Sequence, residues 1–370
     1  MKVLVHIYLA DNLGDDLFAK ILLERYPHVQ FYFLHESARY EFLESYQNAH
    51  VIKLPILGRI NFAVSNYFSS KLAFYIYLKK LKKIFKEIEP SFSAFLVIGG
   101  SLFMEGKSEY LKKSFYNIVY DVFKKKPKFI IGGNFGPYRN KEYLEFFRKI
   151  FSSSTDVCFR DAYSYGLFPD ISTVRLAPDV VFNIINEHVK KDPKKVGVVP
   201  ISLTRRPALK EFSTIYNLFL SQLISKFSDH GYEVTMYAFC KSEGDEKAME
   251  EIYSLAISKE NIDIINYEGR KIDQFLHHFS TNSYVVTSRF HGMILGLIYG
   301  INTYPISYSR KLVNVLDDMN FTGSYKDIER IVSTNVDVAF DEILANHFNV
   351  QQYLEDKDNQ FKILDSYFND

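Results

Sequence analysis

The stretch at 288–300, SRFHGMILGLIYG, joins two different apolar patterns. The residues before it, SYVVT at 283–287, are β-branched and aromatic and predict a buried strand. The residues after His291 lack strand alternation and end on a glycine, which predicts a short buried helix. Arg289 and His291 are therefore expected at a strand-to-helix turn, where free N–H groups and the positive end of the helix dipole favour anions.

Strand-like and helix-like runs alternate along the rest of the chain. Strands separated by helices predict βαβ crossovers and mostly parallel sheets. A charged, proline-containing stretch, NEHVKKDPKKV at 186–196, predicts a linker between domains. The expected strands are 3–10, 31–34, 94–100, 128–133 and 156–160 before the linker, and 196–203, 232–239, 263–267, 283–288 and 303–308 after it.

These patterns predict an α/β protein of two Rossmann-like domains facing a cleft. A chain of 370 residues is long for one core. We expect an N-terminal domain at 1–188, a C-terminal domain at 189–340 and a helical tail at 341–370. Ligands of open parallel sheets bind beyond the carboxyl ends of the strands, so the residues that follow the strands are the candidate site.

The composition narrows the function classes. A net charge of +1 argues against a nucleic-acid-binding role, and 47% hydrophobic with 24% charged residues is typical of a soluble globular protein. Cys158 and Cys240 lack metal-ligand spacing and predict buried, reduced thiols, which fits a cytoplasmic location. The sequence predicts neither a signal peptide nor a membrane-spanning segment.

Cationic side chains follow several expected strands of the second half. Arg205 and Arg206 follow its first strand, and Lys311 follows its last. A cation at a helix N-terminus is repelled by the helix dipole, and such an unfavourable placement is usually retained because it serves function. For His291 the alternative is a buried structural role. Arg289, His291 and Lys311, with either of the two other arginines, would form a site able to hold a phosphate and a carboxylate together.

Small and polar residues follow the strands of the first half. Each group alone is explained by a tight turn or a helix cap, but their recurrence at one sheet edge favours a ligand cleft. Asp179 either caps a helix or orients a catalytic partner. Spacings typical of a zinc site or of a serine or cysteine nucleophile are missing, so we expect no metal. The groups are Asn12 to Asp16, Gly99 to Ser101, Gly132 to Pro137, Arg160-Asp161 and Ala177 to Asp179.

The ordered set of these motifs resembles the polysaccharide pyruvyl transferase family. The motifs are N-x-G-D at 12–15, a glycine pair at 99–100, G-x-x-G-P at 133–137, R-D-x-x-S at 160–164, P-D at 178–179, R-x-H at 289–291 and Y-x-x-K at 308–311. The resemblance implies a glycosyltransferase-B-like fold. It also implies transfer of a pyruvyl group from phosphoenolpyruvate to two hydroxyls of a sugar, forming a cyclic ketal in an exopolysaccharide or capsule without a cofactor.

The resemblance also implies roles for particular residues. Arg289 and His291 would bind the donor, with His291 as the acid or a phosphate ligand, and Asp179 completes the predicted catalytic set. Lys311, Arg205 and Arg206 would support the donor. The saccharide acceptor, free or lipid-linked, would lie on the first domain. The residues expected to contact it are Asn12, Gly14, Asp15 and Asn134, and the candidates for the general base are Asp15, Asp161 and Asp179.

Two rival functions remain open from the residues. One is a nucleotide-sugar-dependent glycosyltransferase of the same fold, and the other is a non-catalytic sugar-binding member of a polysaccharide assembly complex. The second predicts sugar binding without donor affinity, and the cations Arg289, His291 and Lys311 argue against it.

The stretch at 60–89 combines apolar positions at helical spacing with a run of lysines. One interpretation is an ordinary amphipathic helix with a solvated charged face. The other is a peripheral contact with the inner face of the cell membrane, which would bring the enzyme to a lipid-linked saccharide.

Overall fold

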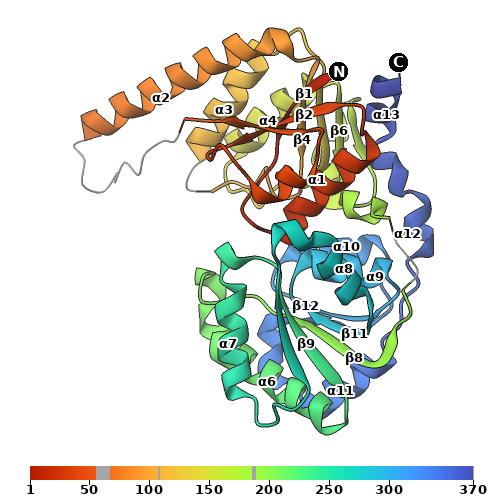
Figure 1. Ribbon diagram of the computed structural model, residues 1–370. Helices are drawn as coiled ribbons and strands as arrows, with labels where there is room; N and C mark the ends of the chain where they lie inside the picture. The colour runs from red at the N-terminus through yellow and green to blue at the C-terminus, as the bar shows by residue number, and fades with distance from the viewer. Residues whose placement is uncertain (56–66, 107–108, 186–188, 370) are drawn as a thin grey trace. The chain divides into compact units, whose positions relative to one another are not determined.

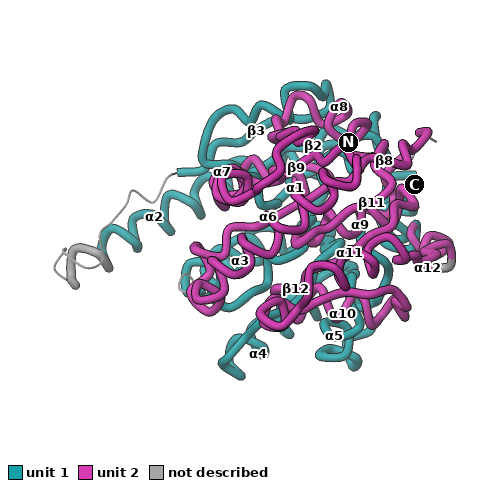
Figure 2. The backbone as a smooth tube through the Cα atoms, turned by 90° about the horizontal axis from the view of Figure 1, so that it is seen from below, with its two compact units in different colours: residues 1–9, 18–180, 358–370 teal, residues 10–17, 181–357 magenta. Residues whose placement is uncertain are grey.

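The computed structural model describes residues 1–55, 67–106, 109–185 and 189–369 (Figure 1). The chain divides into two compact units, the first made of 1–9, 18–180 and 358–370 and the second of 10–17 and 181–357 (Figure 2). The start of the predicted linker, 186–188, and the start of the predicted lysine-rich helix, 60–66, lie outside the described residues.

The first unit contains a parallel sheet with the strand order β3-β2-β1-β4-β5-β6-β7. Every residue of β4 and β5 is buried, as expected for parallel strands with both faces covered. The sequence pattern predicts the inner strands and misses the two edge strands. Strand β3 is only partly buried, and β7 has only 3 residues. The strands are β1 (Lys2–His6), β2 (Gln30–His35), β3 (Ala49–Lys53), β4 (Ala94–Ile98), β5 (Lys128–Gly133), β6 (Asp156–Phe159) and β7 (Val174–Leu176).

Aromatic side chains fill the core of the first unit. Phe103 packs edge-on against Phe151 with ring centroids 5.2 Å apart, and Phe151 packs against Phe168 at 4.9 Å. Such edge-to-face pairs add to the burial of a large apolar surface. The helices are α1 (Leu13–Arg25, which crosses the unit boundary), α2 (Tyr67–Ile88), α3 (Glu109–Val122), α4 (Lys141–Ser152), α5 (Ala162–Gly166) and α13 (Lys362–Asn369), with 3₁₀ helices η1 (Glu41–Ser45) and η2 (Glu89–Ser91).

The second unit contains a parallel sheet with the order β10-β9-β8-β11-β12-β13. Strand β8 begins at Asp192, inside the stretch predicted as a linker, because Asp192 pairs with Asn282 beside a register shift. The strands are β8 (Asp192–Val199), β9 (Glu233–Ala238), β10 (Ile262–Asn266), β11 (Asn282–Thr287), β12 (Asn302–Ser307) and β13 (Lys326–Asp327).

Helix α9 (Phe290–Ile298) lies directly on its neighbouring strands. A Cβ atom added to Gly292 or Gly296 would lie 2.3 Å from the hydroxyl of Thr287 or Thr303, so only glycine permits this approach. The other helices are α6 (Ser213–Asp229), α7 (Asp245–Leu255), α8 (Ile272–Ser280), α10 (Arg310–Asp318), α11 (Val336–Ala345) and α12 (Gln351–Glu355). The remaining 3₁₀ helices are η3 (Val180–Asn183) and η8 (Lys357–Gln360), which cross the unit boundaries, and η4 (Pro207–Phe212), η5 (Lys241–Glu243), η6 (Gly269–Lys271) and η7 (Ile328–Ser333).

Each sheet has one point at which the strand order reverses. In the first sheet this point lies between β1 and β4, and in the second between β8 and β11. Open parallel sheets bind ligands outside the carboxyl ends of the strands at such a point. Arg289 lies two residues after the end of β11, at the N-cap of α9, so the turn singled out by the sequence lies at the reversal point of the second sheet. Among the residues that the structure describes, no helix is long and apolar enough to cross a membrane.

Gln360 ties the C-terminal segment 358–370 to the first unit. Its side chain is fully buried. Its Oε1 accepts a hydrogen bond from the backbone N–H of Gly132 at 2.9 Å, and its Nε2 donates to the carbonyl of Ala177 at 3.0 Å.

We predict that Gln360→Ala lowers the free energy of unfolding by about 1–3 kcal/mol, because it leaves a buried N–H and a buried carbonyl without their partners. Urea denaturation measures the change. Gln351→Ala, at an exposed position of α12, is the control and should stay within about 0.5 kcal/mol of the wild type. Equal losses in the two variants would contradict the anchoring role.

Candidate functional site

Arg289 lies at the expected turn, and its guanidinium is paired with two carboxylates. Its Nε donates to Oδ2 of Asp245 at 2.9 Å, and its Nη1 donates to Oε2 of Glu243 at 2.7 Å. Its Nη2 donates to the second oxygen of Asp245. Arg289 is 7% exposed and Asp245 is fully buried, so this bidentate pair is shielded from solvent.

Asp245 also holds the end of β9. Its Oδ2 accepts the backbone N–H groups of Phe239 at 3.1 Å and Cys240 at 2.9 Å. Asp245 begins α7 directly after Gly244, which has a φ of 86°. From the sequence, Asp245 and Glu243 look like the acidic, solvated start of a helix, so sequence reasoning misses both; the glycine before Asp245 is the signal that marks a constrained turn.

Arg289 and Glu243 stabilise each other's charges, whereas burial raises the pKa of Asp245 despite its contact with Arg289. Burial would lower the pKa of Arg289, but the charges of Asp245 and Glu243 outweigh it and raise that pKa. Burial would likewise raise the pKa of Glu243, but Arg289 and Arg206 lower it below 4.5. Arg289 and Glu243 are therefore charged at neutral pH, and the carboxylates hold Arg289 in one orientation.

The other predicted donor cations lie on the same unit. Arg206 donates from Nη2 to Glu243 at 2.8 Å and lies over the ring of Tyr308, 4.7 Å from its centroid. The ammonium of Lys311 lies 4.9 Å from the ring centroid of Phe290, the residue between Arg289 and His291. Arg205 donates to the carbonyl of Ser242 at 2.6 Å. The R-x-H and Y-x-x-K motifs are therefore in contact, because Lys311 packs on Phe290 and Arg206 connects Tyr308 with Glu243, the partner of Arg289.

The N-x-G-D segment also belongs to the second unit, where it lies against His291. A Cβ atom added to Gly14 would lie 1.9 Å from Nδ1 of His291, so the half-buried imidazole occupies the space that a side chain would need. The amide of Asn12 bridges this turn, because its Oδ1 accepts from the N–H of Gly14 at 3.2 Å and its Nδ2 donates to Asp15 at 2.6 Å.

Backbone contacts fix this segment to β9 and its following loop. The N–H of Leu13 donates to the carbonyl of Phe239 at 3.0 Å, and Asn12 forms an isolated antiparallel bridge with Cys240. Asp16, fully buried, accepts a hydrogen bond from the hydroxyl of Tyr267 at 2.7 Å. The structure thus brings Asn12, Gly14 and Asp15, predicted for the acceptor, onto the same unit as the histidine predicted for the donor.

A second buried cluster, in the first unit, contains Asn134 and Asp179. Arg160, 1% exposed, donates from Nη1 to Asp179 at 2.6 Å and from Nη2 to Oδ1 of Asn134 at 2.8 Å. A Cβ atom added to Gly100 would lie 2.4 Å from Nη2 of Arg160, so the glycine pair makes room for this guanidinium. Asp179 is therefore the ion-pair partner of Arg160.

Asp161 caps a helix in the same cluster. Its Oδ1 accepts the N–H of Ser164 at 2.8 Å, in the manner of a helix N-cap. The hydroxyl of Ser164 in turn accepts the N–H of Phe135 at 2.7 Å. The R-D-x-x-S and G-x-x-G-P motifs are thus joined by one hydrogen-bond chain, whereas Arg289, His291 and Lys311 lie in the other unit.

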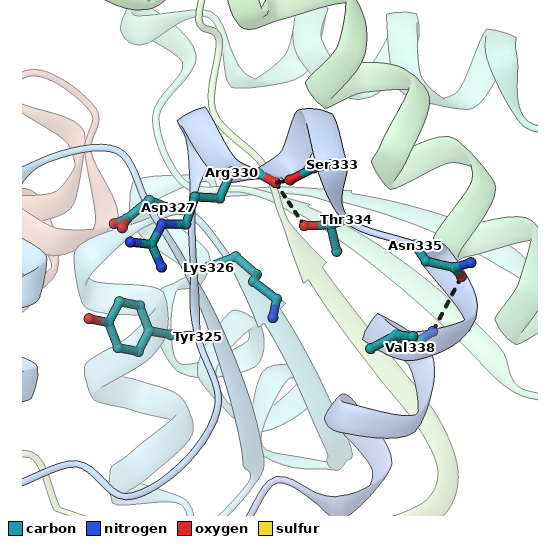
Figure 3. Close-up of a pocket in the computed structure, with 8 residues that line it drawn as sticks. All are labelled: Tyr325, Lys326, Asp327, Arg330, Ser333, Thr334, Asn335 and Val338. Carbon is teal, nitrogen blue, oxygen red and sulfur yellow. Dashed lines mark hydrogen bonds between the residues drawn. The ribbon is translucent and has the colours of Figure 1, made fainter.

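The second unit also has a surface cavity of about 510 Å³, which lies apart from the two clusters and is lined by residues of neither (Figure 3). Lys326, which lies in it, is paired with Glu342 at 2.9 Å. None of the predicted site residues lines this cavity, so we assign it no part in the candidate site. The lining residues are Tyr325, Lys326, Asp327, Arg330, Ser333, Thr334, Asn335 and Val338.

His6, the last residue of β1, lies at the reversal point of the first sheet. Its ring centroid is 4.6 Å from that of Phe115 and 6.0 Å from that of Tyr116, both on α3. Burial, together with the positive charge of Lys112, lowers the pKa of His6 to about 4. Sequence reasoning assigns His6 no role, although a titratable residue at the end of a buried strand is a recognisable signal.

Two parallel α/β units define the class of protein, a glycosyltransferase-B-like fold, as predicted. Similar solved structures include UDP-GlcNAc 2-epimerase from Methanocaldococcus jannaschii, with a TM-score of 0.61, 9% identity and full coverage of both chains. The Neisseria meningitidis UDP-GlcNAc 2-epimerase bound to UDP-GlcNAc has a TM-score of 0.57 at 9% identity, again with full coverage of both. Phytolacca americana UGT2, complexed with UDP-2fluoro-glucose and pterostilbene, has a TM-score of 0.54 at 11% identity and covers 100% of this chain and 99% of its own.

The chain belongs to the polysaccharide pyruvyl transferase family, whose model matches residues 12–310. The match begins at Asn12 of the N-x-G-D motif and extends past the R-x-H motif, so it includes residues of both clusters. A search of curated protein sequences finds no significant match.

We predict that Gly14→Ala destabilises the protein by about 1–3 kcal/mol, because the new methyl group overlaps the ring of His291 and must displace it. Thermal and urea unfolding measure the change. Gly166→Ala is the matched control, since a Cβ atom there meets nothing within 4 Å. If Gly14→Ala is as stable as Gly166→Ala, the packing of the imidazole on Gly14 is wrong.

We predict that His6 makes the protein less stable as the pH is lowered. The folded state lowers the pKa of His6 from 6.5 to about 4, so it favours the neutral ring. This contribution is fully present above about pH 6.5 and is lost as the pH falls towards about 4. From pH 7 to pH 5 the wild type should lose about 1–2 kcal/mol more than His6→Gln does. Urea titrations at both pH values measure this difference, and parallel losses in the two proteins would contradict it.

Proposed function

We propose that this protein transfers the pyruvyl group of phosphoenolpyruvate onto two hydroxyls of a sugar in a cell-surface polysaccharide or its lipid-linked precursor. The products are a cyclic ketal and inorganic phosphate. Membership of the family supports the pyruvyl transfer.

The packing of His291 on Gly14 is the observation that carries the proposal. It joins the R-x-H and N-x-G-D motifs, which are separated by more than 270 residues of the matched range, at the reversal point of the second sheet. Motif residues that are distant in sequence and adjacent in space are what a built site requires. Arg206, Arg289 and Lys311 lie on the same unit and supply cationic groups for the two anionic ends of phosphoenolpyruvate.

The proposed reaction balances without a metal, oxidant or cofactor. One sugar hydroxyl attacks C2 of phosphoenolpyruvate while a proton from His291 is added to C3, which becomes a methyl group. The second hydroxyl then attacks C2, the C2–O bond to phosphate breaks, and the ring closes. One hydroxyl proton restores His291 and the other leaves with phosphate. Arg206 and Lys311 would hold the phosphate and carboxylate, and Arg289, fixed by Asp245, would stabilise the developing charge.

We assign the general base to Asp15, which would take a proton from a sugar hydroxyl and release it again to the final acceptor, His291 or phosphate. Asp161 caps α5 and Asp179 is paired with Arg160, both in the first unit. Asp15 belongs to the turn that contains Gly14, on the unit that holds His291. Asn12 and Gly14 of that turn remain our candidates for contacting the acceptor.

Lys311→Met is a better test of donor binding than a change at Arg289. Removing Arg289 would leave Asp245 buried without its cation and is expected to destabilise the fold. We predict that calorimetry detects phosphoenolpyruvate binding to the wild type, and that Lys311→Met weakens it about tenfold or more, because a charge-assisted contact is lost.

Lys247→Met, at an exposed position of α7, is the matched control and should bind like the wild type. UDP-GlcNAc is titrated in parallel. Binding of UDP-GlcNAc without binding of phosphoenolpyruvate would contradict pyruvyl transfer and favour a nucleotide-sugar glycosyltransferase.

A further inference from the structure

Helix α2 presents one continuous stripe of residues that changes in character along its length. The stripe has the spacing i, i+3, i+4, i+7 of a single helix face, repeated over the described part of α2. Its first members are apolar and largely exposed, Leu72 at 59%, Tyr75 at 54% and Ile76 at 45%. Its later members are the lysines Lys79, Lys82, Lys83 and Lys86.

The opposite face of α2 supplies its anchor. Leu81 and Phe85 are fully buried in the core cluster of the first unit, and Ile88 packs against the same cluster. The apolar part of the stripe therefore faces away from the core to which the later turns are attached. Figures 1 and 2 show the first described turns of α2 projecting beyond the rest of the first unit.

The lysines are concentrated at one place on the surface. Lys79, Lys82, Lys83 and Lys86 line a surface depression of about 370 Å³, with Glu87 beside them. Lys82 donates to Asp121 of α3 at 2.7 Å, and the charges of Lys124 and Lys86 join it in lowering the pKa of that carboxylate. The helix as a whole carries six lysines and one glutamate.

We infer that this stripe is a docking surface for an anionic lipid bilayer, with Leu72, Tyr75 and Ile76 entering the interface and the lysines binding lipid phosphates. A solvated face explains the lysines but not three large apolar side chains exposed in the same stripe. A second copy of the chain is disfavoured in either orientation. Parallel pairing of two stripes would place lysines against lysines, and antiparallel pairing would place the lysines of one copy against the apolar side chains of the other. The aliphatic part of a lysine side chain can lie on an apolar surface while its ammonium binds a lipid phosphate. Lysines that follow an apolar segment on the same helix face are therefore well placed at a membrane interface.

The test uses the full chain and vesicles of phosphatidylcholine, with or without a quarter of phosphatidylglycerol. We predict cosedimentation with the anionic vesicles and about a hundredfold weaker binding of K79E/K83E/K86E, since each of the three lysines near an anionic surface contributes about fivefold. The control K247E/K259E/K271E makes the same charge change at exposed positions of the second unit and should bind like the wild type. L72Q/I76Q keeps the lysines and should also bind more weakly.

Equal binding of the wild type to both kinds of vesicle, or equal binding of the two triple variants, would overturn the inference. A wild type that forms dimers dissolved by L72Q/I76Q and does not bind vesicles would assign the stripe to a second copy instead. The lysine substitutions lie outside the donor site, so phosphoenolpyruvate titrations of the same variants keep a failure here distinct from a failure of the proposed reaction.

Discussion

The second unit depends on the buried pair between Arg289 and Asp245. A charged pair costs desolvation, which is offset only when each member has several hydrogen bonds. Asp245 meets that condition by accepting from Arg289 and from the N–H groups of Phe239 and Cys240. The same residues 239 and 240 hold the backbone of Leu13 and Asn12, and the following Gly14 receives the ring of His291. These contacts therefore form one continuous chain from Arg289 to His291, the first and last residues of the R-x-H motif.

The first unit repeats this arrangement with other residues. Arg160 is held by Asp179 and Asn134, and Gly100 leaves room for its guanidinium as Gly14 leaves room for His291. In both cases the glycine matters because of the space that a Cβ atom would occupy, since neither has a positive φ. The sequence predicts that Gly14 contacts the acceptor; in the structure the space beside this glycine is occupied by a side chain of the protein, His291. Each cluster therefore orients one large polar side chain by packing it on a glycine.

The sequence pattern predicts the inner strands and the turn at Arg289 because both depend on local signals. Inner parallel strands are apolar on both faces, whereas the missed strands β3, β7 and β13 lie at sheet edges and pair on one side only. Asp245 and Glu243 could not be predicted in the same way, because their partner Arg289 is distant in sequence. The position of residues 10–17 on the second unit is likewise set by tertiary contacts with residues 239, 240 and 267.

The carboxylates change how the cationic site is expected to act. Arg289 and Arg206 are balanced by Asp245 and Glu243, so their combined charge alone gives little attraction for an anion. What the carboxylates provide is orientation. A guanidinium carries five N–H donors, and the hydrogen bonds to Asp245 and Glu243 use three of those on Arg289. A cation fixed in this way needs no reorganisation when charge develops on a reacting group, which is where preorganised dipoles contribute most. Electrostatic attraction of the donor would then depend on Lys311 and on the N-terminus of α9. Arg206 would act on the bound donor as an oriented hydrogen-bond donor, and Arg289 would stabilise the transition state.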